Sequence, residues 1–253
     1  FLSFAGYLIS KNTLQLTLKD FTKKYAIRII IPFFIAWPFF LILWHYYTLT
    51  IQNLLYYLII PMFHFWFVYN FLISIYVLWI LNKIKISDDN VLIIGMCTTI
   101  LSILIVAWYP ASQIIINFYQ PYYFGFFCIG YYIKQKNWYI NKNYLRLFFL
   151  FVILLWIIRI YLAKYNNFKK ITADFILLNI ILIFFVISIS YYYPNKKNKI
   201  LEWIGKNSYP IYLWHPIVAT IIMYLQFNNI YIAWFFGFIG ILILLICIFC
   251  GTK

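Results

Sequence analysis

Charged residues are scarce in this 253-residue chain. Lys, Arg, Asp and Glu together make up 10% of it, whereas apolar residues make up 66%, with 27 Phe, 25 Tyr and 10 Trp. A soluble fold of this length needs far more charge to cover its surface, so that class is excluded. Intrinsic disorder is excluded as well, because disordered segments are poor in apolar and aromatic residues. Long apolar runs that do not alternate predict an all-α, polytopic bundle of transmembrane helices.

Acidic residues are the scarcest charged type, with only five Asp and Glu. Three of them fall in expected cytoplasmic loops: Asp88, Asp89 and Glu202. Asp174 lies near the start of an expected helix, where an ion pair or the favourable position of a negative charge at a helix N-terminus explains it. A paired-carboxylate acid/base site and a proton pump built on buried acids are therefore disfavoured. No His, Cys, Asp or Glu cluster has metal-ligand spacing, and Gly-rich phosphate loops are absent. We expect neither a metal nor a resident cofactor.

Apolar runs separated by short polar turns predict about nine helices. They comprise a half-span at 1–10 and spans at 28–47, 64–81, 91–108, 118–133, 146–163, 172–193, 208–226 and 230–250. The apolar stretch 54–63 contains Pro61, which predicts an interfacial or re-entrant segment. Residues 1–253 are expected to form a single membrane domain. Because 1–10 supply about half of the ~20 residues that cross a bilayer, we expect one further helix upstream, which makes ten.

The basic residues predict the orientation of these spans. Of the 20 Lys and Arg, 16 fall in loops on one side of the expected membrane, and the other side holds only Arg159, Lys164, Lys169 and Lys170. Lys and Arg concentrate in cytoplasmic loops, so the first side is cytoplasmic and the C-terminus lies inside. We expect a multi-pass protein of the inner (cytoplasmic) membrane. The bilayer and its anionic lipids account for the positive charge, so no nucleic acid is expected.

Ionisable groups at membrane depth are functional candidates, because their burial is costly. His45 lies near the outer end of its helix among aromatic residues and fits an interfacial belt. His64 opens a helix at the outer boundary, where it is either an anchor beside Trp66 or a functional group. His215 lies roughly 10 Å into its helix at 1.5 Å per residue, and Pro216 frees a backbone carbonyl nearby. His215 therefore needs a polar partner inside the protein, and catalysis is the alternative role.

A dense cationic group directly precedes the helix expected from Ile29. It contains Lys19, Lys23, Lys24 and Arg28. On a continuing helix the last three form one cationic face. Cytoplasmic anchoring is one explanation, and a site for a phosphorylated cytosolic donor, held by charge-assisted hydrogen bonds, is the other.

Several segments, taken together, resemble the acyltransferase 3 family of integral-membrane enzymes, which O-acylate cell-surface sugars. They are FLSFAGYLIS, FTKKYAIRIIIP, HFWFVYNFLISIYVLW and GKNSYPIYLWHP, with YYFGFFCIGYYIKQK as a fifth. Their order and spacing agree with a ten-helix protein that has both ends inside. The resemblance covers essentially the whole chain.

The resemblance implies a membrane O-acyltransferase that moves an acyl group, expected to be acetyl, from acyl-CoA to a hydroxyl of a cell-surface or lipid-linked sugar. Lys23, Lys24 and Arg28 match the segment that meets the acyl-CoA phosphates. Further motif or pore positions are Gly6, Tyr7, Trp66, Ser208 and Tyr212, and the catalytic candidates are His64 and His215. The resemblance also implies that the family's principal catalytic His lies in the first helix, which is the helix expected upstream of this chain. A neutral His would act as general base.

Two other classes of function stay open. A transporter or flippase for a lipid-linked glycan would predict paired intramembrane charges or repeated half-structures, and the sequence contains neither. A non-catalytic membrane anchor or sensor module is the third alternative.

Overall fold

The computed structural model describes most of the chain. The described residues are 2–45, 50, 56, 58, 65–108, 121–165, 173–192, 199–224 and 230–251. Throughout these ranges the backbone is helical or forms short connections, and it contains no strand. The prediction of an all-α bundle is confirmed.

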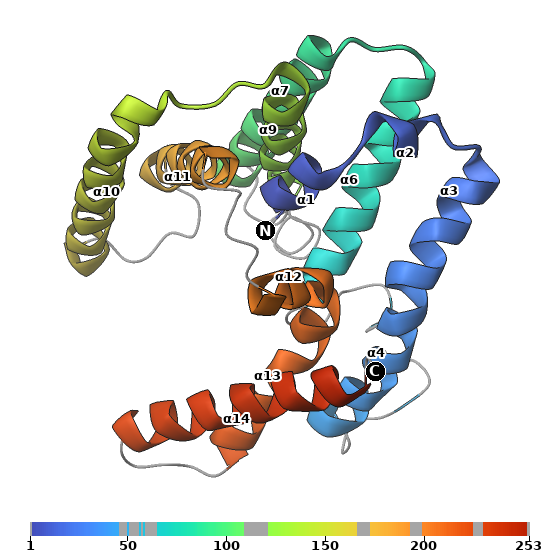
Figure 1. The fold of residues 1–253 in the computed structure, drawn as a ribbon, viewed down its shortest axis with the longest axis vertical. Helices are drawn as coiled ribbons and strands as arrows, with labels where there is room; N and C mark the ends of the chain where they lie inside the picture. The colour runs from blue at the N-terminus through green and yellow to red at the C-terminus, as the bar shows by residue number, and fades with distance from the viewer. Residues whose placement is uncertain are drawn as a thin grey trace. The chain divides into compact units, whose positions relative to one another are not determined.

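Helices occupy each of the predicted spans (Figure 1). They are α1 (Leu2–Leu8), α2 (Lys11–Gln15), α3 (Leu18–Tyr25), η1 (Ala26–Ile30), α4 (Ile31–His45), α6 (Trp66–Lys83), α7 (Asp88–Trp108), α9 (Tyr123–Lys136), η5 (Lys142–Tyr144), α10 (Leu145–Tyr165), α11 (Ala173–Tyr192), α12 (Lys199–Lys206), α13 (Ser208–Tyr224) and α14 (Ile230–Gly251). The expected interfacial stretch 54–63 lies outside the described residues except for Tyr56 and Leu58.

Four helical stretches are long and apolar enough, by length and composition, to cross a membrane. Among the described residues these are Leu18–Ile42, Trp66–Lys83, Asp88–Ile105 and Lys142–Tyr161. Leu177–Tyr192 and Phe236–Ile248 are shorter apolar helices. The chain is thus a multi-pass membrane protein.

The first long span begins about ten residues earlier than the sequence predicts. The predicted start was residue 28, but α3 begins at Leu18 and continues through η1 into α4. The α3 segment is amphipathic: Phe21 and Tyr25 are buried while its charged residues face outward, so packing of one face favours the helix. The basic residues therefore lie on a helix and not in a loop.

The turn η1 is π-helical, and the N–H of Ile31 donates to the carbonyl of Ala26, five residues earlier. Pro32 follows at the start of α4. A proline inside a helix has no N–H, and its ring clashes with the carbonyl four residues before it, here that of Arg28. A single wide π turn accommodates such a residue without ending the helix.

The chain divides into two compact units. Unit 1 contains Phe1–Thr17 and Tyr69–Lys196, and unit 2 contains Leu18–Val68 and Lys197–Lys253. The prediction of a single domain over 1–253 stays a prediction.

Unit 1 is built around α9, which packs against α1 and α7. Close approach depends on glycine: a Cβ on Gly6 would overlap the Phe127 carbonyl, and one on Gly130 would overlap the carbonyl of Ser3. Interfaces between membrane helices commonly use such small residues to bring backbones together. The short α1 is thereby held firmly against α9.

Unit 2 places α13 beside both α4 and α14. Aromatic rings join the first pair, since the Trp214 ring lies 5.5 Å from that of Phe39 and 6.0 Å from that of Phe40. Phe65 extends the cluster, 5.5 Å from Phe40 in an edge-to-face arrangement. Such pairs add to the burial of their apolar area, so this cluster fixes the α13 motif against the helix that carries the basic residues.

Candidate active site

The predicted donor-binding residues lie on the α3–η1 helix of unit 2. Lys23 and Arg28 are exposed and Lys24 is partly exposed. The charges of Lys24 and Arg28 lie close enough to repel each other. A cationic surface that keeps mutually repelling charges together is suited to an anionic ligand, which would relieve the repulsion.

Tyr209, in the first turn of α13, reaches this cationic segment. Its hydroxyl donates a hydrogen bond of 2.8 Å to the carbonyl oxygen of Ile29, within η1 and adjacent to Arg28. The bond thus links the predicted motif on α13 to the segment that carries Arg28. Tyr209 was not among the predicted site residues, although its place in the GKNSYPIYLWHP motif was a signal.

Tyr212 lies one turn further along α13 in a group of rings. Its ring centroid is 4.9 Å from Phe67, 6.4 Å from Tyr209 and 5.8 Å from the ring of His215. Trp66, the first residue of α6, has its ring 6.2 Å from that of Phe67. Through Phe67, the structure therefore connects Trp66 of one predicted motif with Tyr212 and His215 of another in one group of rings.

His215 makes the polar contact that its depth in the helix requires. Its Nδ1 lies 2.7 Å from the carbonyl oxygen of Tyr212, and its side chain is exposed. A carbonyl oxygen only accepts, so Nδ1 is the donor, and a neutral ring then carries its lone pair on Nε2. In this tautomer it is Nε2 that can accept a proton from a hydroxyl group.

The remaining candidates lie at the ends of helices or outside the described residues. Ser208 is the first residue of α13 and is exposed. His64 lies outside the described residues, and His45 is the last residue of α4. The amphipathic α12 directly precedes α13, and its exposed Glu202 pairs with Lys206 at 2.7 Å. That hydrogen bond lowers the pKa of Glu202 below its usual range.

Gly6 and Tyr7 belong to unit 1. The structure gives Gly6 a packing contact with α9, as described above. The Tyr7 hydroxyl lies 3.3 Å from that of Tyr139, whose ring stacks on Tyr191 at 3.8 Å, and Lys134 lies over the Tyr7 ring. Burial, followed by the hydrogen bond with Tyr7, raises the pKa of Tyr139 above its usual range, so this hydroxyl stays protonated at physiological pH.

An ionic cluster at the start of α7 was not predicted as a cluster. Asp88 accepts from Lys11 and from the buried hydroxyl of Tyr131, each at 3.0 Å. Asp89 accepts from Tyr132 at 2.9 Å and from Lys136 at 3.0 Å. The sequence placed both acids in a cytoplasmic loop, yet they open a helix, where negative charge is favourable. Their role is to tie α2 and α9 to α7.

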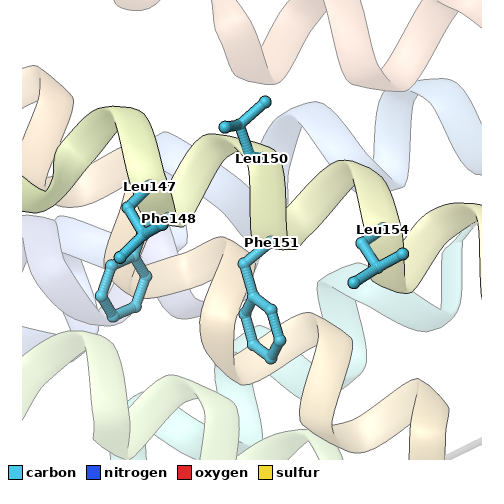
Figure 2. A pocket seen from close by; sticks show the side chains of 5 residues that line it. All are labelled: Leu147, Phe148, Leu150, Phe151 and Leu154. Carbon is cyan, nitrogen blue, oxygen red and sulfur yellow. The ribbon is translucent and has the colours of Figure 1, made fainter.

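An open, apolar pocket lies along α10 (Figure 2). Its volume is about 450 Å³, and it is lined by Leu147, Phe148, Leu150, Phe151 and Leu154. Phe151 and Leu154 point to one side of the helix and Leu150 to the other (Figure 2). With no polar side chain among its lining residues, this pocket suits hydrocarbon and offers no group for acyl-transfer chemistry.

In the part of the chain that the structure describes, no group of three or more His, Cys, Asp or Glu could hold a metal ion.

The fold and these residues define a multi-pass helical membrane protein with a cationic helix face joined to a histidine-bearing helix. Comparison with known families matches the acyltransferase domain family, Acyl_transf_3, over residues 1–252. The chain belongs to this family, as its motifs predicted. No curated protein and no solved structure matches the chain.

Proposed function

We propose that this membrane acyltransferase transfers an acyl group, with acetyl expected, from acyl-CoA to a hydroxyl of a cell-surface or lipid-linked sugar. Family membership supports acyl transfer. The identification of acyl-CoA as the donor and of a sugar hydroxyl as the acceptor is our proposal. The observation that carries it is the hydrogen bond between Tyr209 and Ile29, because it joins the cationic helix face to the helix of His215.

The cationic face supports a donor with phosphate groups. Lys23, Lys24 and Arg28 supply charge that phosphates bind through charge-assisted hydrogen bonds. Along α13, His215 lies about 9 Å from Tyr209 at 1.5 Å per residue. A donor with an anionic head and a thin arm could bind its head at the cationic face and extend its thioester toward His215. The aromatic rings between these points suit such an arm.

The chemistry needs a base and a hydrogen-bond donor. A sugar hydroxyl is a weak nucleophile, and among the described residues Nε2 of neutral His215 is the group that would accept its proton as the oxygen attacks the thioester carbonyl. The oxyanion that forms needs donors, and tyrosine hydroxyl groups such as that of Tyr212 are candidates of the right type. The acid/base step needs no metal.

The test separates recognition of the donor's phosphates from catalysis. Acetyl transfer to a glycan acceptor is measured in membrane vesicles that contain the full natural protein. The donors compared are acetyl-CoA and a phosphate-free acetyl thioester of N-acetylcysteamine. We expect the triple variant K23A/K24A/R28A to raise KM for acetyl-CoA at least tenfold and to leave KM for the phosphate-free donor unchanged, because each charged hydrogen bond contributes about 1.5–3 kcal/mol.

The matched control is K136A/K142A/R146A, which removes the same charges from exposed positions of unit 1. It is expected to leave both KM values unchanged. An unchanged KM for acetyl-CoA in the K23A/K24A/R28A variant would contradict the donor site. Absence of any acyl transfer from acetyl-CoA by the wild-type protein would contradict the proposed donor altogether.

A further inference from the structure

Pro216 changes the hydrogen bonding of the helix just where His215 stands. In an α-helix the N–H of each residue donates to the carbonyl four residues earlier. Pro216 has no N–H, so the carbonyl of Tyr212 loses the backbone donor that any other residue at 216 would supply. A helix carbonyl that has lost its backbone donor can accept a hydrogen bond from a neighbouring side chain instead.

His215 supplies that replacement. Its Nδ1 lies 2.7 Å from the Tyr212 carbonyl oxygen, a short distance for an N–H···O bond. Because the oxygen only accepts, the bond requires a proton on Nδ1. The second ring nitrogen, Nε2, is on the far side of the ring and carries the lone pair in the neutral form.

We propose that Pro216 is a positioning residue that selects the tautomer of His215 and so prepares Nε2 as the general base. This inference rests on the proposed function. Pro216 itself is buried, and the Thr220 hydroxyl donates to its carbonyl at 2.9 Å, which fixes the turn after the histidine. The exposed side chain of His215 keeps Nε2 within reach of a substrate.

The proton that leaves the acceptor ends on the departing sulfur. The acceptor hydroxyl oxygen forms a bond to the thioester carbonyl carbon while its proton passes to Nε2 of His215. The tetrahedral intermediate collapses, the carbon–sulfur bond breaks, and the sulfur takes the proton from Nε2. The products are the O-acyl sugar and the free thiol, and His215 returns to its Nδ1-protonated neutral form.

Pro216→Ala gives the helix back its missing N–H. The new backbone N–H then competes with Nδ1 for the Tyr212 carbonyl, so the ring is no longer held in one tautomer. His215→Asn provides the complementary change, because its side-chain N–H₂ can still donate to that carbonyl but no base remains. Thr220→Val is the matched control, since it disturbs the same turn and leaves the bond between His215 and Tyr212 in place.

The tautomer is read by ¹⁵N NMR of histidine-labelled protein in lipid bicelles, and the H215N variant identifies the resonances of His215. We expect the proton on Nδ1 in wild type and in T220V, and a mixture of tautomers in P216A. Kinetically, P216A should lower kcat about tenfold with KM for acetyl-CoA within twofold of wild type. H215N should lower kcat a hundredfold or more, in line with loss of a general base.

Either of two spectra overturns the proposal: a proton on Nε2 in neutral wild-type protein, or an Nδ1 proton fully retained in P216A. These measurements do not depend on acyl transfer, so their failure is distinct from failure of the proposed function. If H215N retains wild-type kcat, the role of His215 as base is overturned even where the tautomer is as expected.

Discussion

The hydroxyl of Tyr209 donates to the carbonyl oxygen of Ile29 across 2.8 Å, and this bond joins residues 180 positions apart in the chain. Ile29 lies in the π turn beside Arg28, and Tyr209 lies in the helix that carries His215. Within unit 2 this bond, together with the ring contacts between α13 and α4, holds the basic segment beside the histidine helix. Loss of this bond should weaken the binding of a donor that contacts both the basic segment and the histidine helix.

Tyr209→Phe removes this bond and keeps the ring. A hydrogen bond of this kind contributes about 1 kcal/mol net, so we expect KM for acetyl-CoA to rise about fivefold. Binding of the phosphate-free thioester should change less, because it does not use the basic segment. Steady-state kinetics with both donors measure the difference.

Tyr144→Phe is the control for loss of a tyrosine hydroxyl, because Tyr144 is an exposed residue of η5 in unit 1. It should leave both KM values unchanged. An equal rise of KM for the two donors in Y209F would show that the bond supports the fold in general and not the basic segment.

Because glycines bring α1 and α9 into close contact, we expect that adding a single methyl group to one of these glycines lowers the stability of the protein. Gly6→Ala and Gly130→Ala each place a methyl group where a backbone carbonyl already lies. The helices must move apart, and overpacking of this kind costs typically 1–3 kcal/mol. We expect a lower thermal unfolding temperature for each variant in detergent, measured by tryptophan fluorescence.

Gly205→Ala is the matched control, because nothing lies within 4 Å of a Cβ at that position of α12. Alanine in an open helical site is favourable by roughly 0.5–1 kcal/mol relative to glycine. The control should therefore unfold at the wild-type temperature or slightly above it. Wild-type stability in both G6A and G130A would contradict the close packing of α1 on α9.

The two neighbouring acids of α7 should differ in importance. Asp88→Ala leaves the buried hydroxyl of Tyr131 without its acceptor, at a cost of about 1–3 kcal/mol. Asp89→Ala removes an equal charge from the same helix end, but its partners Tyr132 and Lys136 donate at exposed positions and can turn to water. We expect D88A to lower the unfolding temperature clearly and D89A to change it little. Equal decreases of the unfolding temperature in D88A and D89A would show that these acids stabilise the protein only through their negative charge at the N-terminus of α7.

The sequence predicted the helices well because membrane spans depend on long apolar runs, which are visible without tertiary information. It missed the early start of the first long span at Leu18. The basic residues Lys19, Lys23 and Lys24 have the composition of a loop, and only the burial of Phe21 and Tyr25 on one face makes this segment helical. That burial depends on packing partners, which a single sequence does not reveal.

The candidate site was predictable in its residue types but not in its contacts. Pro216 signalled a freed carbonyl, and the structure identifies it as that of Tyr212 and the partner as His215. The hydrogen bond from Tyr209 reaches Ile29 within a π turn, and a single π turn has no periodicity that a sequence pattern detects. His64 lies outside the described residues, so its role stays a prediction.

The orientation of α10 is a prediction that labelling can decide. The candidate membrane span Lys142–Tyr161 comprises η5 and most of α10, and both of its end residues are exposed. The positive-inside rule places Lys142 in the cytoplasm and Tyr161 outside. A membrane-impermeant thiol reagent added to intact cells should therefore label Tyr161→Cys and not Lys142→Cys, in a protein whose four native cysteines are replaced by alanine. Permeabilised cells should give labelling at both positions. Labelling of Lys142→Cys alone in intact cells would reverse the orientation, and because Lys23, Lys24 and Arg28 share the predicted side of Lys142, it would place the basic face away from the cytosolic acyl-CoA.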